Sequence, residues 1–287
     1  MTEQYASQTI AVAGAGLMGS GIAETAAAAG LKVIAYEPEH AALRRAIERI
    51  EGSTGHAQKR GKLSAEEREL LLGRVAYTTD LGDIGDASFV VEAIVEDERA
   101  KRDLFGQLDA AVPDETVLAS NTSSIPIAQL AAATARPDRV VGLHFFSPVP
   151  VMPLVEIVHP LDASDQTLTA AEQLVVGLGK TPIHTKDRSG FVVNMLLVPF
   201  LMSAVRMYED GFATRDDIDE GMRLGCGHPM GPLTLCDFIG LDVLYSVCES
   251  LYDEFKEPVY APPPLLKRMV VSGRLGRKSG RGFYEYG

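Results

Sequence analysis

Two side chains capable of acid–base chemistry stand where a folded chain could bring them together. His144 ends the apolar run 140–144, and Glu156 lies within Leu154-Val-Glu-Ile-Val158. Strand alternation gives Glu156 the same face as two apolar side chains, so its carboxylate needs a partner to offset desolvation. If the chain turns at Ser147-Pro-Val-Pro150 and returns, Glu156 comes back beside His144. The two could then form an acid–base dyad, or equally a buried structural hydrogen bond.

Other polar side chains could join such a dyad. Asn194 is the single amide in Phe191-Val-Val-Asn-Met-Leu-Leu197, and a buried amide without partners would cost about 1 kcal/mol or more. It should therefore face a substrate carbonyl or backbone at a domain junction. Ser123 and Ser124 directly follow a strand-like run, where they could line a site. For either serine alone, a helix N-cap is the simpler explanation.

A glycine-rich loop supplies a candidate nucleotide site. Residues 9–13 predict a strand, which runs into Gly14-Ala-Gly16-Leu17-Met18-Gly19 and then an alanine-rich helix. Gly14 can take a tight turn, Gly16 lets the backbone approach a pyrophosphate, and Gly19 permits close helix packing. The N-terminus of the helix would then bind the anion.

An acid at the end of the next predicted strand indicates which nucleotide. Glu37 lies about 20 residues beyond the glycines, where a carboxylate accepts hydrogen bonds from the adenosine ribose and repels a 2′-phosphate. Pro38-Glu-His40 supplies no arginine for such a phosphate. NAD is therefore favoured over NADP, and FAD, which uses the same turn, is the strongest competitor.

These residues need a sheet to position them. β-Branched runs alternate with helical patterns from residue 9 to about 186, which is typical of a parallel sheet covered on both faces. After Gly190 only helical patterns remain. We therefore predict an α/β fold, with a Rossmann-like doubly wound sheet at residues 1–186 followed by an all-α domain at residues 187–287. The expected strands are 9–13, 32–36, 74–77, 88–94, 116–120 and 140–144, and the expected helices of the second domain are 190–211, 214–225, 231–239, 240–256 and 263–272.

Composition excludes several classes of function. The 287 residues include 27 Lys and Arg against 39 Asp and Glu, and the net charge of −12 disfavours nucleic acid and anionic membranes as partners. The longest apolar stretch, residues 191–205, is interrupted by polar residues and proline and is too short to span a bilayer. The opening residues have no signal-peptide pattern, so we expect a cytoplasmic protein.

The cysteines and one basic segment bear on metal and phosphate binding. Cys226, Cys236 and Cys248 match no metal-binding or redox spacing, so we expect buried thiols and no metal. Residues 41–62 carry six basic and two acidic side chains, a local charge of +4. This segment could attract a phosphorylated ligand or could simply be a solvated helix face.

Several longer segments together resemble one family, the L-3-hydroxyacyl-CoA dehydrogenases. The similarity covers nearly the whole chain in order, and the chain length is similar to that of short single-function 3-hydroxybutyryl-CoA dehydrogenases. The segments that carry it are Gly14–Ala23, Val91–Glu96, Ser120–Ser124, His144–Pro148, Gly190–Asn194, His228–Leu233, Asp237–Asp242 and Gly280–Tyr284.

The resemblance implies a reaction and roles for four residues. The reaction is the reversible, NAD-dependent oxidation of (S)-3-hydroxyacyl-CoA to 3-oxoacyl-CoA, with short acyl chains. His144 would remove the 3-hydroxyl proton while hydride passes to the nicotinamide, and Glu156 would orient and stabilise the imidazolium. Ser123 would hydrogen-bond the reacting oxygen, and Asn194 would contact the substrate from the helical domain.

The resemblance also implies contacts to the cofactor, to CoA and to a second subunit. Glu96 and Lys101 match positions near the nicotinamide end of the cofactor, Glu37 matches the ribose acid, and the helical domain would form a homodimer. The remaining matched positions are Leu17, Met18 and Asn121 for the cofactor and His56, Lys59 and Arg60 for CoA. Two residues depart from the family: Ser147 replaces a common Asn, and His56 replaces a common Lys, so one cofactor contact should differ and CoA affinity should be weaker.

Three alternatives stay open. Dehydrogenases of free β-hydroxy acids share this architecture but use a catalytic Lys near the domain junction, and here no Lys follows Gly190 until Lys256. A relative acting on sugar acids would keep the His–Glu pair. A non-catalytic NAD-binding protein would bind the cofactor without turnover.

Overall fold

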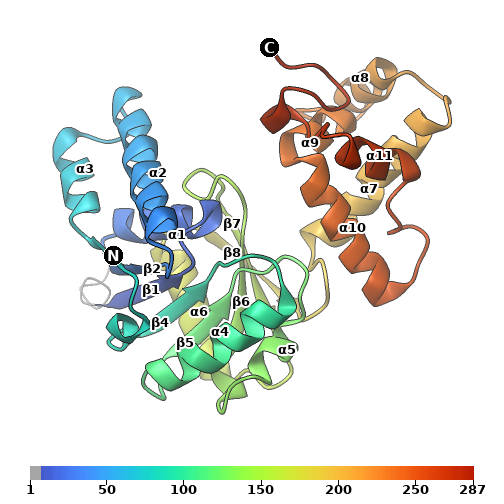
Figure 1. Ribbon diagram of the computed structural model, residues 1–287. Coiled ribbons are helices and arrows are strands. Elements are labelled where there is room, and N and C mark those ends of the chain that lie inside the picture. Colours follow the sequence, from blue (N-terminus) through green and yellow to red (C-terminus); the bar gives the residue numbers. More distant parts are fainter. Residues whose placement is uncertain (1–7) are drawn as a thin grey trace. The chain divides into compact units, whose positions relative to one another are not determined.

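The computed structural model describes residues 8–287. The chain divides into two compact units, one ending at Asp187 and the other running from Arg188 to Gly287. The first unit contains an eight-stranded sheet with helices, and the second is built of helices (Figure 1). The predicted fold class, a Rossmann-like α/β sheet followed by a helical domain, is confirmed.

The sheet has the strand order β3-β2-β1-β4-β5-β6-β7-β8. The chain passes from β1 outward to β2 and β3 and then crosses back to β4 on the other side of β1. Open α/β sheets bind ligands in a crevice at such a reversal, outside the carboxyl ends of the strands, which here are β1 and β4. The strands are β1 (Thr9–Ala13), β2 (Lys32–Tyr36), β3 (Val75–Thr78), β4 (Phe89–Glu92), β5 (Val117–Ser120), β6 (Val140–Phe145), β7 (Leu154–His159) and β8 (Thr181–Lys186).

Helices cover both faces of this sheet. One apolar core joins Ile10 and Val12 of β1 to Ile22 of α1 and Val175 of α6, so α1 and α6 share a face. Figure 1 shows α4 and α5 in front of the sheet and α6 behind it. This double cover explains why the central strands are continuously apolar. The helices are α1 (Leu17–Ala28), α2 (His40–Lys59), α3 (Ala65–Leu72), α4 (Glu98–Ala111), α5 (Ile127–Ala131) and α6 (Asp165–Gly177), with short 3₁₀ turns η1 (Leu81–Ile84) and η2 (Pro137–Arg139).

The sheet differs from the sequence prediction at one end. The strands up to β6 are parallel as expected, whereas β7 runs antiparallel to β6, which agrees with the return of the chain considered for the turn at 147–150. The connection between these strands, residues 146–153, is too short for a crossover, which needs about a dozen residues or more. Strand β8 was not predicted, because its residues are exposed or half-buried and include Pro182.

The second unit packs its helices around a separate core. Leu201, Leu233 and Leu251 are fully buried there, and Asp237 accepts hydrogen bonds from the amides of Phe283 and Tyr284, which secures the C-terminal segment. The helices are α7 (Val193–Glu209), α8 (Arg215–Gly225), α9 (Pro232–Ile239), α10 (Leu241–Phe255) and α11 (Pro264–Val271), with η3 (Arg277–Ser279). Across residues 8–287, none of the helices combines the length and apolarity needed to cross a membrane.

The expectation of three buried thiols is wrong for one cysteine. Cys236 and Cys248 are buried in the helical core, but Cys226 is exposed. Cys226 lies at the C-cap of α8, where the helix ends at the surface.

Candidate active site

The glycine loop connects β1 to α1. Its three glycines differ in what an added side chain would meet. Gly14 has a φ of +100°, which favours glycine, and it would also place a Cβ 2.8 Å from the Ala93 backbone. A Cβ on Gly19 would lie 1.8 Å from the carbonyl oxygen of Gly14, so this residue allows α1 to pack against the loop. A Cβ on Gly16 would meet open space. Gly16 is therefore small for a reason other than internal packing.

The position of Gly16 fits an approaching phosphate. It occupies the N-cap of α1, where the first amides of the helix point outward and the helix dipole favours an anion. Leu17, which is exposed, and Met18, which is half-buried, begin the helix. The residues present thus fit the pyrophosphate of a dinucleotide at this end of α1.

We expect Gly16→Ala to fold normally and to bind NADH at least about tenfold more weakly. Its φ of −66° suits alanine and no neighbouring atom lies within 4 Å of the added methyl group, whereas the methyl group would occupy the space a pyrophosphate needs. Fluorescence titration with NADH measures the affinity, and thermal unfolding checks the fold. Unchanged affinity would contradict this role for Gly16.

Glu37 stands directly beside the glycine loop. It follows β2, and its Oε2 accepts a hydrogen bond of 3.1 Å from the amide of Ala15. Arg49 of α2 donates to the carbonyl of the same residue, also at 3.1 Å. The Ala15 peptide is thus held from both sides, and the Glu37 carboxylate lies where an adenosine ribose would be recognised. Arg49 was not among the predicted site residues, although it is one of the basic side chains noted in residues 41–62.

The predicted His–Glu pair is formed by two facing strands. His144 of β6 and Glu156 of β7 are register partners in the antiparallel pair, and the Nδ1 of His144 lies 2.6 Å from Oε2 of Glu156. Both are buried, with relative exposures of 6% and 0%. The carboxylate fixes the orientation of the ring through Nδ1. Phe146 packs against the imidazole, with ring centroids 4.6 Å apart.

Glu96 collects hydrogen bonds from the loop after β5. One carboxylate oxygen accepts from the hydroxyl of Thr122 at 2.6 Å and from the amide of Ser123 at 2.9 Å. The hydroxyls of Ser123 and Ser124 also donate to it. Burial acts to raise the pKa of Glu96, but Lys101 and these hydrogen bonds outweigh it, so the pKa lies below its ordinary value. Ser123 and Glu96 are therefore parts of one organised loop.

Lys101 is held inside the protein between two carboxylates. Its relative exposure is 1%, and its Nζ lies 2.5 Å from Glu92 and 3.4 Å from Glu96. The second oxygen of Glu92 accepts from the Ser120 hydroxyl at 2.6 Å. Lys101 and Glu96, which the resemblance assigned to the same end of the cofactor, thus form an ion pair, and Lys101 itself is buried. Glu92 itself was missed as a functional candidate.

Asn121 links the end of β5 to β6. Its Oδ1 accepts a 2.9 Å hydrogen bond from the amide of Phe145, the neighbour of His144. A residue predicted to contact the cofactor therefore also fixes the backbone beside the histidine. Ser147 lies just beyond, before a cis bond to Pro148.

The predicted CoA residues lie at the end of α2, and Asn194 lies in the helical unit. His56 and Lys59 are exposed in the last turn of α2, and Arg60 follows as the C-cap. Figure 1 shows α2 and α3 side by side at one end of the first unit. Asn194 is the second residue of α7 and half-buried in the helical unit, preceded by Gly190 and Phe191, which both have positive φ. Within residues 8–287 no group of three His, Cys, Asp or Glu side chains is placed to hold a metal ion.

Fold and site together define a class of protein. A doubly wound sheet, a glycine loop with an adjacent ribose acid, and a His–Glu pair at the carboxyl end of a strand are the parts of a dehydrogenase that uses an NAD-type cofactor. Residues 9–188 match the 3-hydroxyacyl-CoA dehydrogenase NAD binding domain, and residues 190–286 match the C-terminal domain of the same family. The chain belongs to the 3-hydroxyacyl-CoA dehydrogenase family, as its sequence motifs predicted.

Individual relatives support this assignment over the whole chain. A 3-hydroxybutyryl-CoA dehydrogenase of Mycobacterium tuberculosis is 52% identical over 281 residues, covering 97% of this chain and 98% of the relative. The human mitochondrial hydroxyacyl-coenzyme A dehydrogenase is 41% identical, covering 96% and 90% of the two chains. The crystal structure of (S)-3-hydroxybutyryl-CoA dehydrogenase from Ralstonia eutropha superposes with a TM-score of 0.93 at 44% identity, covering 98% and 99%.

Proposed function

We propose that this enzyme interconverts (S)-3-hydroxybutyryl-CoA and its 3-oxo form with NAD. The observation that carries the proposal is the buried His144–Glu156 pair at the end of β6, in the same unit as a glycine loop that fits a dinucleotide. The identity to named 3-hydroxybutyryl-CoA dehydrogenases supports the short acyl chain.

His144 acts as the base in this proposal. Because Glu156 engages Nδ1, Nε2 takes the proton from the 3-hydroxyl group, and the buried carboxylate stabilises the imidazolium that results. When bound beside the substrate, NAD would supply the acceptor for the hydride of C3. In the reverse direction the same nitrogen returns the proton to the oxygen.

Ser123 and Asn194 hold the substrate in this proposal. Glu96 accepts from both the amide and the hydroxyl of Ser123, and in this proposal that hydroxyl contacts the reacting oxygen once substrate is bound. Asn194 supplies a carboxamide from the start of α7. The helical unit therefore contributes substrate binding, and the basic residues at the end of α2, Lys59 and Arg60, bind phosphate groups of CoA.

NAD rather than NADP is the cofactor we infer. The Glu37 carboxylate is already held at the glycine loop by the Ala15 amide, where it would repel a 2′-phosphate and accept hydrogen bonds from ribose hydroxyls. Arg49 is bonded to the Ala15 carbonyl, which keeps its guanidinium on the backbone.

The first test is NADH formation from (S)-3-hydroxybutyryl-CoA and NAD. We expect activity at least about a hundredfold above that with NADP or with free 3-hydroxybutyrate, since charge repulsion and the lost CoA contacts each weaken binding. A long-chain 3-hydroxyacyl-CoA tests the acyl preference. Turnover of the free acid at equal efficiency would favour a dehydrogenase of free hydroxy acids, and tight NADH binding without turnover would favour a non-catalytic protein.

We also propose that two copies associate through the helical unit. Several large apolar side chains of this unit are exposed, and association of two copies would remove those at the interface from water; they are Leu196, Phe212, Leu224, Phe238 and Val271. Light scattering at micromolar concentration should give twice the chain mass of 30.8 kDa. A monomer under these conditions would contradict the proposal.

A further inference from the structure

A charged group of three residues lies within the first unit at the carboxyl ends of β4 and β5. Glu92 ends β4 and pairs in register with Ser120 of β5. Lys101 reaches back from α4 to both Glu92 and Glu96. We call Glu92, Lys101 and Glu96 the charged triad; Glu92 and Lys101 are buried, and the side chain of Glu96 is 39% exposed.

The contacts of the triad are those of two ionised carboxylates and one ammonium. Oε1 of Glu92 meets the Lys101 ammonium and the Ile94 amide, which are both donors, at 2.5 and 2.7 Å. The Oε1 of Glu96 meets four donors on residues 122–124. Two negative charges and one positive charge leave the triad with a net charge of −1.

The strand order places this charge relative to a bound dinucleotide. Glu37 at the end of β2 marks the adenosine side, and the glycine loop after β1 marks the pyrophosphate. A dinucleotide that spans the crevice must extend its other half over the carboxyl ends of β4, β5 and β6. That half carries the nicotinamide ring, which is positively charged when oxidised and neutral when reduced.

We propose that the charged triad favours the oxidised cofactor over the reduced one, and that Glu92 sets its net charge. A negative charge in a site of low dielectric stabilises the cationic nicotinamide ring of NAD but not the uncharged dihydronicotinamide ring of NADH. On the enzyme, this charge shifts the hydride equilibrium toward NAD and the hydroxyacyl form. The inference rests on the proposed function, because it takes the cofactor to be a nicotinamide dinucleotide.

The test compares dissociation constants for NAD and NADH in Glu92→Gln and the unaltered protein. Glutamine keeps the shape and can still accept from Lys101 and Ile94 and donate to Ser120, but it removes one negative charge. We expect the ratio of the NAD constant to the NADH constant to rise about tenfold, the scale of one unit charge at about 10 Å and an effective dielectric constant of about 20. Calorimetry for NAD and fluorescence titration for NADH measure the two constants.

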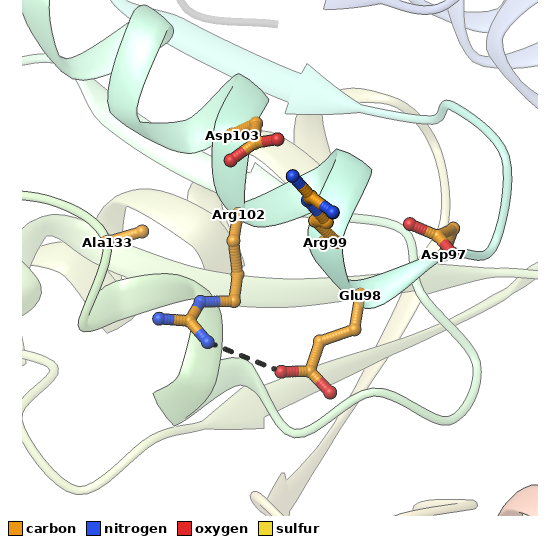
Figure 2. A pocket seen from close by; sticks show the side chains of 6 residues that line it. All are labelled: Asp97, Glu98, Arg99, Arg102, Asp103 and Ala133. Atoms are coloured by element: carbon orange, nitrogen blue, oxygen red, sulfur yellow. Dashed lines mark ion pairs between the residues drawn. The ribbon is translucent and has the colours of Figure 1, made fainter.

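Glu98→Gln is the matched control. Glu98 begins the same helix, but its side chain is 50% exposed and pairs with Arg102 at 3.5 Å, on the face of α4 that lines a surface pocket (Figure 2). Solvent screens such a charge, so the ratio should stay within about twofold of the unaltered protein.

A second variant covers the case in which Glu92→Gln does not fold. Glu96→Gln removes the same charge from a side chain that is 39% exposed, and the ratio should rise in the same direction. An unchanged ratio in a folded variant, or an equal change in both dissociation constants, would overturn the inference. The proposed function would still stand in that case if the unaltered enzyme turns over (S)-3-hydroxybutyryl-CoA. An unaltered protein that binds neither cofactor would overturn both.

Discussion

Replacing His144 with alanine is expected to lower kcat by at least about a hundredfold while the affinity for NADH stays unchanged. The imidazole is the group assigned to the substrate proton, and it is held in place by a 2.6 Å contact with Glu156. Without the imidazole, the Glu156 carboxylate cannot replace it as the base for the substrate's 3-hydroxyl proton, because Glu156 is fully buried. Steady-state kinetics with (S)-3-hydroxybutyryl-CoA give kcat, and fluorescence titration gives the NADH affinity.

His184→Ala provides the control for this experiment. His184 lies on β8 and pairs with His159 through a 2.8 Å contact between ring nitrogens. It has no part in the proposed site, so its kcat should remain within about twofold of the unaltered enzyme. If His144→Ala retained turnover comparable to this control, His144 would not be the base.

Replacing Gly19 with alanine is expected to lower the free energy of unfolding by about 3 kcal/mol or more. The added Cβ would lie 1.8 Å from the carbonyl oxygen of Gly14. Both are backbone positions, so no side chain can rotate away, and α1 must move from the loop between it and β1. Urea unfolding followed by circular dichroism measures the loss.

The comparison with Gly16→Ala distinguishes packing from ligand contact. The two variants add the same methyl group to the same loop, yet at Gly16 it meets open space. Gly16→Ala should keep stability within about 0.5 kcal/mol, as expected for a surface substitution. Equal stability losses in the two variants would show that loop geometry, rather than the Gly14 contact, governs the effect.

The parts of the site predicted from sequence were those with a local physical reason. In the glycine loop, the spacing of the glycines matched three needs: a tight turn, a close approach of the backbone to a pyrophosphate, and close packing of the helix that follows. Glu156 on an apolar strand face required a partner, and the short connection after β6 brought it beside His144. In each case a few neighbouring residues determined the geometry.

Glu92 and Lys101 illustrate what was missed and why. Glu92 stands in a buried strand, so the desolvation argument made for Glu156 applied equally to it. Lys101 shares a helix face with Leu104 and Leu108, which predicts its burial. Their meeting depends on α4 packing against the sheet, and that is a tertiary contact which no local pattern specifies.

The edge of the sheet was also beyond local reasoning. Strand β8 has no continuous apolar run because its side chains are exposed or only half-buried. Its pairing with β7 supplies the structure that its own sequence pattern does not indicate. The burial of Cys226 was also predicted wrongly from local pattern. An apolar residue at the end of a helix can lie at the surface, and only the packing of the helix decides whether it does.

The bond between Glu37 and the Ala15 amide has a thermodynamic consequence for cofactor recognition. A glutamate side chain usually loses rotamer entropy when it orders around a ligand, and that loss weakens association. Here the carboxylate is already oriented by the protein's own backbone, so this ordering takes place during folding. The adenosine end of the cofactor therefore meets a preorganised receptor, and its binding should proceed with little conformational adjustment of this residue.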